Sequence, residues 1–225
     1  MKKLIIITQS KGGAGKSILT FLLAEKYPDA VVFDMDNATN TTALQLQYRN
    51  PIPITFLDNN NVIDRGRFNT FLEEIHKIDN NLSICDMGAS VSEQFPFYLS
   101  DVSDFLSDVL TELQIDLEIM VIVGGGNIFT QTTSYLEDLR LSVNEQFTIR
   151  IMKNEYYDFN QDQNLTLEKY ANKHRLEIVP FNISRDMNQS TQNRLKEVLK
   201  SGKGIETAGS ISRGYFQKAI KLLAV

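Results

Sequence analysis

The sequence has little of what disulfide-rich, metal-binding or membrane proteins usually contain. Its 225 residues include one cysteine, Cys85, which excludes a disulfide framework, a zinc cluster and an intrachain CxxC redox pair. The two histidines, His76 and His174, lie far apart in the sequence and lack the spacing of metal ligands, so we expect both on surface helices. No apolar run approaches the roughly 20 residues that span a bilayer. The apolar segment Leu4–Ile7 is too short for a signal peptide. These absences predict a cytoplasmic protein.

Positive charge is scarce over most of the chain. The formal net charge is −5, yet residues 190–225 carry seven basic and two acidic side chains, so this segment is +5 and the rest of the chain is −10. The segment 78–139 contains eleven carboxylates and no lysine or arginine. A net negative charge argues against a surface that binds phosphate backbones uniformly. The charge is instead divided unequally between two parts of the chain.

Short apolar segments alternate with longer segments of helical periodicity, which is the pattern of a parallel sheet covered by helices. We therefore predict an α/β fold of three layers, a mostly parallel sheet with helices on both faces, formed by residues 1–225 as one domain. The expected strands are 4–8, 30–33, 54–57, 82–85, 117–123, 147–152 and 176–179, of which 54–57 is an edge strand because prolines precede it. The expected helices are 17–27, 68–75, 97–113, 130–141, 165–174, 187–199 and 211–223.

The most informative segment is a glycine-rich loop between the first expected strand and the first expected helix. From Ser10 to Ser17 the sequence is SKGGAGKS, a P-loop pattern in which Ser10 replaces the usual first glycine. Glycines allow the backbone to fold around phosphates with its N–H groups pointing inward, and the helix N-terminus adds positive potential. We expect Lys16 to neutralise the β- and γ-phosphates and Ser17 to bind Mg²⁺. A plain strand-to-helix turn would not require this Lys-Ser pair.

A second lysine, Lys11, precedes the glycine pair of the loop. The pattern KGGxGK[ST] resembles the deviant Walker A motif of the ParA/MinD ATPase family, in which this lysine reaches the phosphates of the partner's nucleotide across a dimer. Such a cation stabilises charge on the transferring phosphoryl group as an arginine finger does; the alternative is a solvated loop lysine. The resemblance implies an ATPase with Lys11, Lys16 and Asp36 as catalytic residues and a nucleotide held by Gly12, Gly13, Ala14, Gly15, Lys16, Ser17 and Ile18.

Carboxylates follow two further expected strands. Segment 34–36 (DMD) resembles the family's switch I sequence DxDP, with Asn37 in place of the proline, and segment 86–88 (DMG) resembles Walker B followed by switch II. Carboxylates at strand C-termini lie on the ligand side of a doubly wound sheet. The resemblance implies that Asp36 orients or activates the attacking water and that Asp34 and Asp86 belong to the metal shell. It also implies that the Gly88 N–H faces the γ-phosphate. Taken singly, each carboxylate is better explained as a helix cap or a solvated loop end, but together, at strand ends after a P-loop, they favour the functional interpretation.

The residues expected to bind the base follow the last two strands. Asn154 stands where an asparagine amide binds adenine in the family, and Pro180 stands where the family often packs a proline near the ring. The guanine motif NKxD is absent, which favours ATP over GTP. An ordinary loop asparagine fits Asn154 nearly as well.

The resemblance extends over residues 1–182 and is closest to the TraL/StbB subgroup of ParA-like proteins. It rests on TQSKGGAGKS at 8–17, DMGAS at 86–90, VGGG at 123–126 and NEYY at 154–157. Members of this subgroup are encoded beside plasmid transfer and stability functions. The resemblance implies ATP and Mg²⁺ as cofactors, a nucleotide-sandwich homodimer, slow hydrolysis and a plasmid-encoded DNA-binding or transfer protein as partner. Two alternatives stay open: a metabolic enzyme of the dethiobiotin-synthetase type, which would not need the second lysine, and a nucleotide-binding adaptor without hydrolysis.

Two surfaces lie outside these motifs. The first is a row of acidic residues at helical spacing that forms either a solvated helix face or a site for a basic protein. The row comprises Asp101, Asp104, Asp108 and Glu112.

The second surface is the helix 211–223, where apolar and basic residues alternate. It could cover the core, lie on a membrane or bind non-specific DNA. Gly214 inside it costs about 1 kcal/mol relative to alanine, which disfavours a membrane helix; we expect core packing first and DNA second.

Overall fold

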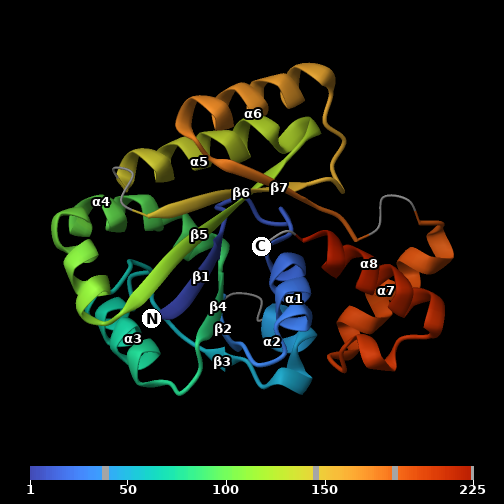
Figure 1. Ribbon diagram of the computed structural model, residues 1–225, viewed down its shortest axis with the longest axis horizontal. Coiled ribbons are helices and arrows are strands. Elements are labelled where there is room, and N and C mark those ends of the chain that lie inside the picture. The colour runs from blue at the N-terminus through green and yellow to red at the C-terminus, as the bar shows by residue number, and fades with distance from the viewer. Residues whose placement is uncertain (37–40, 144–146, 184–186, 224–225) are drawn as a thin grey trace.

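Parallel strands form one sheet with helices on both faces, as the computed structural model shows for residues 1–36, 41–143, 147–183 and 187–223 (Figure 1). Within these residues the sheet has seven strands in the order β3-β2-β4-β1-β5-β6-β7, and every neighbouring pair is parallel. The strands are β1 (Lys2–Thr8), β2 (Val31–Met35), β3 (Ile52–Pro53), β4 (Leu82–Met87), β5 (Ile115–Gly124), β6 (Thr148–Asn154) and β7 (Glu177–Phe181). The helices are α1 (Lys16–Lys26), α2 (Thr41–Gln45), α3 (Arg65–Lys77), α4 (Ala89–Glu112), α5 (Phe129–Ser142), α6 (Gln161–His174), α7 (Gln189–Ser201) and α8 (Ser210–Leu222).

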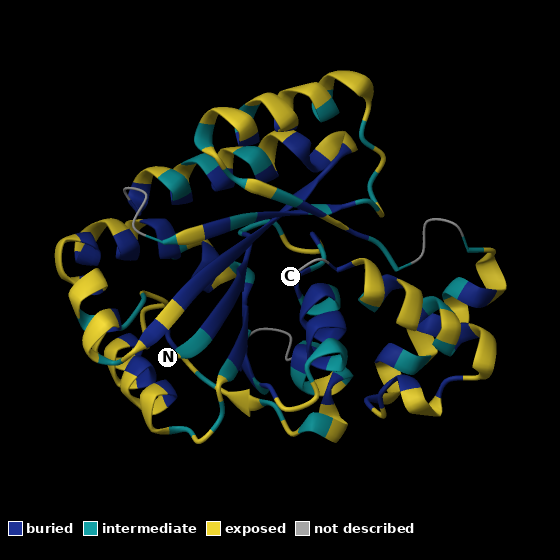
Figure 2. Ribbon diagram, viewed as in Figure 1, coloured by how far each residue is buried: buried dark blue, intermediate teal, exposed yellow. Residues whose placement is uncertain are grey.

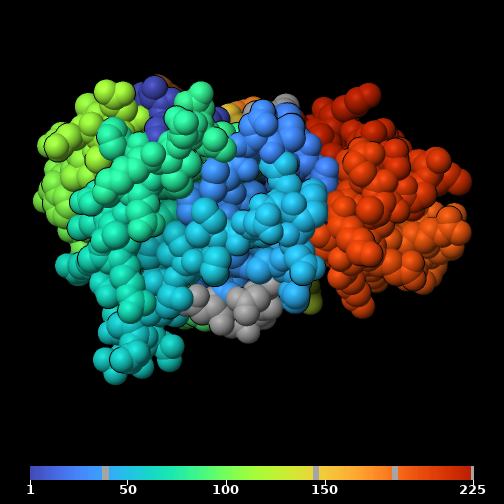
Figure 3. All heavy atoms as spheres, turned by 90° about the horizontal axis from the view of Figure 1, so that it is seen from below, coloured from blue at the N-terminus to red at the C-terminus, as the bar shows by residue number. Residues whose placement is uncertain are grey.

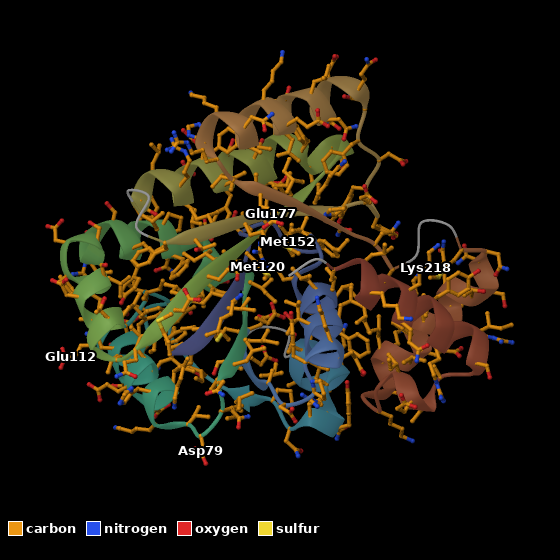
Figure 4. The ribbon with its side chains drawn as sticks, in the orientation of Figure 1. Asp79, Glu112, Met120, Met152, Glu177 and Lys218 are labelled. Atoms are coloured by element: carbon orange, nitrogen blue, oxygen red, sulfur yellow. The ribbon has the colours of Figure 1, made fainter. Side chains whose placement is uncertain are left out.

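The core consists of two apolar layers, one on each face of the sheet. Helices α3, α4, α5 and α6 cover one face, and α1, α7 and α8 cover the other. Met120 of β5 and Met152 of β6, labelled in Figure 4, belong to the second layer. Figure 2 shows the consequence: the central strands are buried along most of their length, α1 has no exposed residue, and the outer helices each bury one side. The three-layer α/β fold predicted from the sequence is therefore confirmed.

The register of the sheet brings the predicted switch carboxylates together. Asp34 in β2 is the register partner of Asp86 in β4, and Asp86 is in turn the partner of Ile7 in β1. Because all three strands run in the same direction, their carboxyl ends meet at one edge of the sheet. This edge is where ligands bind in open α/β sheets.

Two predicted elements have different bounds in the structure, and one helix was not predicted. Helix α4 begins at Ala89 rather than at residue 97, because it continues through Pro96 with Phe95 and Leu99 fully or almost fully buried on either side. The edge strand lies at Ile52–Pro53 rather than at 54–57. The short helix α2 was not predicted from the sequence.

The last two helices gather at one end of the molecule, beside α1 and α2 (Figure 3). Phe216 of α8 is fully buried, and its ring lies 5.5 Å from that of Phe21 in α1. The prediction that the final helix packs on the core is thus confirmed. Ile211 at the start of this helix is 66% exposed, whereas Ala219 and Leu223 are buried with Phe216. None of the helices in the described residues is both long enough and apolar enough to cross a membrane.

Candidate functional site

The loop between β1 and α1 has a backbone that only glycine adopts easily. Gly13 has φ +76° and Gly15 has φ +110°, both in the left-handed region. A Cβ on Gly15 would also lie 2.5 Å from the Nδ2 atom of Asn154. Gly15 is the N-cap of α1 and supplies no side-chain cap, so the first N–H groups of the helix are open to an anion.

Lys16 begins α1 and lies beneath this loop. Its side chain is buried, and its Nζ donates a hydrogen bond to the carbonyl oxygen of Gln9 at 2.8 Å. Burial lowers the pKa of Lys16, and the charges of Asp86 and Asp36 act in the opposite direction. The ammonium group therefore has two carboxylates nearby and one carbonyl as its acceptor. A phosphate oxygen would be a stronger acceptor than that carbonyl because it is charged.

Asp86, in β4, provides an oxygen with no partner. Its side chain is buried, and its Oδ2 accepts a hydrogen bond from the hydroxyl of Thr42, whereas Oδ1 has no hydrogen-bond partner in the described part of the chain. Burial raises the pKa of Asp86 to about 6, and the hydrogen bond from Thr42, the nearby hydroxyl of Ser17 and the charge of Lys16 oppose this rise.

An unpaired buried carboxylate oxygen beside a serine hydroxyl fits a Mg²⁺ ion, which prefers oxygen ligands and usually keeps several waters. The described residues contain no cluster of three or more His, Cys, Asp or Glu side chains. A magnesium site of the P-loop type does not need one, because substrate phosphates supply further oxygens. The residues present are thus suitable for Mg²⁺ bound together with a nucleotide.

Asp34, in β2, is bonded through both of its carboxylate oxygens. Its Oδ1 accepts the N–H of Asp36 at 3.0 Å, and its Oδ2 accepts the N–H of Ala43 at 2.7 Å. Burial raises the pKa of Asp34, and these two bonds lower it. Both oxygens are therefore bonded to backbone N–H groups, and Asp34 links Asp36 to the start of α2. Asn37, where the sequence departs from the family pattern, lies outside the described residues.

Asp36 and Gly88, from the two predicted switch segments, touch each other. A Cβ on Gly88 would lie 2.8 Å from the Cα of Asp36 and 3.0 Å from its Oδ1. Gly88 is the N-cap of α4 and supplies no side chain to the first turn. The two segments are therefore packed closely against each other at the carboxyl ends of β2 and β4.

The loop after β6 holds the P-loop from the opposite side. Asn154 Nδ2 donates to the Ala14 carbonyl at 2.7 Å, and Asn154 Oδ1 accepts the N–H of Tyr156 at 3.1 Å. The hydroxyl of Tyr157 donates to the Gly13 carbonyl at 2.7 Å. The amide predicted to bind adenine thus braces the P-loop in this structure. Its side chain is buried and bonded at both ends.

A cavity of about 200 Å³ lies beside this brace and next to the loop glycines. Of the residues predicted to bind the nucleotide, Ile18 is half-buried and lines this cavity, whereas Pro180 does not. Because side chains alternate along a strand, Phe181 is buried and lines the cavity while Pro180 is exposed on the other side of β7. Helix α7 also lines the cavity, which the sequence did not predict: the contributing side chains are Gln192, Leu195, Lys196 and Leu199.

Lys11, Gly12 and Gly13 lie on the outer side of the loop. Lys11 is half-buried, and its backbone N–H donates to the side-chain oxygen of Gln9 at 3.3 Å. Its ammonium group forms no hydrogen bond or ion pair with the residues that the structure describes. Gly12 and Gly13 are exposed, whereas Ala14 is buried. The predicted catalytic lysines therefore differ: Lys16 faces inward and Lys11 is free of partners within the described chain.

Comparison with solved structures supports the fold. A plasmid partition protein from Borrelia burgdorferi B31 bound to AMPPNP matches with a TM-score of 0.55 and 14% identity, over 99% of this chain and 98% of that chain. A second plasmid partition protein from Borrelia burgdorferi matches with a TM-score of 0.47, 16% identity, 88% of this chain and 96% of that one. The signal recognition particle 54 kDa protein of Aeropyrum pernix K1 in complex with GDP matches with a TM-score of 0.49 and 10% identity, over 98% of this chain and 49% of that chain.

At sequence identities this low the matches show similarity of fold alone, and only the first TM-score exceeds 0.5. No protein-family model matches the sequence. No curated protein matches it either. The chain therefore has the P-loop NTPase fold, and its function must be argued from its own site.

Proposed function

We propose that this chain is a ParA-like ATPase that binds ATP with Mg²⁺, forms a nucleotide-sandwich homodimer and hydrolyses ATP slowly as a switch. The observation that carries the nucleotide site is the arrangement of three groups beside the uncapped start of α1. They are the buried ammonium of Lys16, the hydroxyl of Ser17 and the unpaired Oδ1 of Asp86. The AMPPNP-bound partition protein, which shares the fold over nearly its whole length, supports the same function.

Within this proposal each group has one task. Lys16 exchanges the Gln9 carbonyl for the β- and γ-phosphates, a charge-assisted contact. Ser17 and Asp86 would hold Mg²⁺, which when bound neutralises charge on the phosphate oxygens. The open N–H groups of Gly15 and the first turn of α1 face the phosphates. Asp36 orients the attacking water.

The outward lysine supports the dimer. Because the Lys11 ammonium forms no bond with the described residues of its own chain, it is free to reach the γ-phosphate of a nucleotide in a second copy. A cation delivered in this way stabilises the transition state only in the dimer. A metabolic enzyme of the dethiobiotin-synthetase type would not need it, and an adaptor without hydrolysis would not use it.

The remaining parts of the proposal rest on the sequence resemblance and on the fold. We place the protein in the cytoplasm, in plasmid conjugation, stability or partition, with a plasmid-encoded DNA-binding or transfer protein as partner and non-specific DNA as a second one. We also treat residues 1–225 as one domain, because α8 packs on α1 and α7 on α2. A role at membranes is not proposed.

Nucleotide binding is tested by the Lys16→Ala variant. Loss of the charge-assisted phosphate contacts should cost about 2–4 kcal/mol, a hundredfold or more in affinity. Calorimetry with Mg²⁺ and AMPPNP measures this, and Lys11→Ala is the matched control, because the proposal leaves binding to one chain unchanged there. Wild-type affinity in Lys16→Ala would show that the loop is not a nucleotide site.

Dimerisation and turnover are tested by two further variants. Lys11→Ala should bind AMPPNP normally but lose dimer-dependent ATP hydrolysis, whereas Asp36→Ala should bind ATP and accumulate as a dimer that does not turn over. Light scattering with AMPPNP and phosphate release with ATP are the measurements. A protein that stays monomeric with saturating AMPPNP, with unchanged turnover in Lys11→Ala, would contradict the sandwich dimer but not the nucleotide site.

A further inference from the structure

A second cavity, larger than the one beside the P-loop, lies between α4 and α5. The two helices pack against each other on one face of the sheet (Figure 1), and the groove between them has a volume of about 640 Å³. It begins at Ser10, the first residue of the P-loop, and is open to solvent along the outer sides of the two helices. Nothing in the proposed ATPase chemistry uses it.

Large apolar side chains line this groove although water reaches them. Phe97 of α4 is 76% exposed, and Leu141 of α5 is 59% exposed. Phe105 is 47% exposed and lies farther along the outer side of α4, beyond the residues that line the groove. A single exposed apolar residue is ordinary, but apolar residues gathered on the walls of a concave site are typical of a binding surface.

The same surface is acidic. Glu93 and Asp138 line the groove, and neither forms an ion pair with a described residue. Along α4 the carboxylates of Asp104, Asp108 and Glu112 are exposed on the face that carries the two phenylalanines. The only described cation bonded to this row is Arg65 of α3, which pairs with Asp101 at the edge of the face.

The base of the groove is held in place by buried hydrogen bonds. The hydroxyl of Tyr135, which lines the groove, is bonded to that of Thr8, and Thr8 donates to the hydroxyl of Ser92 at 3.0 Å. Ser92 also accepts the N–H of Gln9 at 3.3 Å. These bonds join α5, the end of β1 and α4, so the two walls keep their separation. A preformed groove costs a ligand less conformational entropy than one that must be ordered on binding.

We propose that the groove between α4 and α5 is a docking site for an amphipathic, basic helix of a partner protein. The apolar side of that helix lies between Phe97 and Leu141, and its lysines and arginines face Glu93, Asp138 and the acidic face of α4. Apolar walls select a helix with an apolar stripe, and the unpaired carboxylates select positive charge around it. This inference does not depend on nucleotide hydrolysis.

The test is a selection from phage-displayed helical peptides with a fixed leucine stripe and with Lys, Arg, Glu or Gln at the other positions. The full-length chain is the target, and enriched peptides are then measured by fluorescence anisotropy. We expect enrichment of basic peptides, with at least tenfold weaker binding to the double variant Phe97→Gln, Leu141→Gln. Binding to Asp138→Lys should be weaker too and should depend less on salt.

Ile211→Gln is the matched control, because it removes an equally exposed apolar side chain from α8. The groove variants alter exposed side chains, so their urea midpoints should equal that of the wild type. Enrichment of acidic peptides, or binding that survives the double variant but not Ile211→Gln, would overturn the proposal. So would sedimentation showing that Phe97→Gln removes self-association while no peptide binds, since the occupant would then be a second copy.

Discussion

Replacing Asp86 by asparagine should stabilise the metal-free protein at neutral pH while destroying its Mg²⁺-dependent nucleotide binding. The folded-state pKa of Asp86 is raised from 3.8 to about 6 by burial, so the folded chain binds this proton more tightly than the unfolded chain does. A raised carboxyl pKa contributes stability that is present below the unfolded pKa and lost as the pH rises through 6. The ionised carboxylate therefore costs the fold about 3 kcal/mol at pH 7.5. Asparagine has the same shape, keeps an acceptor for Thr42 and carries no charge.

The measurement is urea unfolding of wild type and Asp86→Asn in EDTA at pH 4, 5 and 7.5. The variant's gain in unfolding free energy should be small at pH 4, larger at pH 5 and about 3 kcal/mol at pH 7.5. Calorimetry should show in parallel that Mg²⁺ no longer strengthens AMPPNP binding. A gain that does not change with pH, or a loss at pH 7.5, would refute the reasoning that burial of the charge dominates at this position.

Two further predictions concern the brace and the last helix. Gly15→Ala should lower the free energy of unfolding by about 1–2 kcal/mol through backbone strain alone, and by more because the new Cβ meets Asn154 Nδ2. Adding Asn154→Ala removes that obstacle. The loss in the double variant, measured by urea unfolding, should therefore be at least about 1 kcal/mol smaller than the sum of the two single losses. Additive values would contradict the contact. Phe216→Ala should lower the free energy of unfolding by about 3–5 kcal/mol because the ring is fully buried against Phe21. Ile211→Ala should change it by less than about 0.5 kcal/mol. Equal effects would contradict the packing of α8.

The sequence was sufficient for the parts of the site that are continuous in the chain. The P-loop between Ser10 and Ser17 could be predicted because glycines, lysine and serine stand together at a strand-to-helix junction. Asp34 and Asp86 could be placed at strand ends, but the role of Asp34 depends on the N–H of Ala43, whose position comes only from the short helix α2. Such a helix of five residues leaves too weak a periodicity to predict.

The parts that the sequence did not predict depend on contacts between distant segments. Asn154 braces Ala14, 140 residues away in the chain, and no local pattern contains that information. Helix α7 contributes to the cavity only because it packs beside α2. The first turns of α4 were missed for a different reason: Pro96 removes one helical hydrogen bond, although Val91, Phe95 and Leu99 follow a helical period and were available as a signal.

Folding separates the negatively and positively charged segments of the chain in space. The acidic helix α4 and the basic helices α7 and α8 lie at opposite ends of the long axis, as the labels of Glu112 and Lys218 in Figure 4 show. The molecule is therefore an electric dipole along its length, and an external field exerts a torque on it. At low ionic strength a charged partner would turn the protein before touching it, so that the acidic end meets a cation and the basic end meets an anion. The Debye length is about 8 Å in physiological salt, so this orientation acts only over the last stretch of an approach, where it selects which end arrives first.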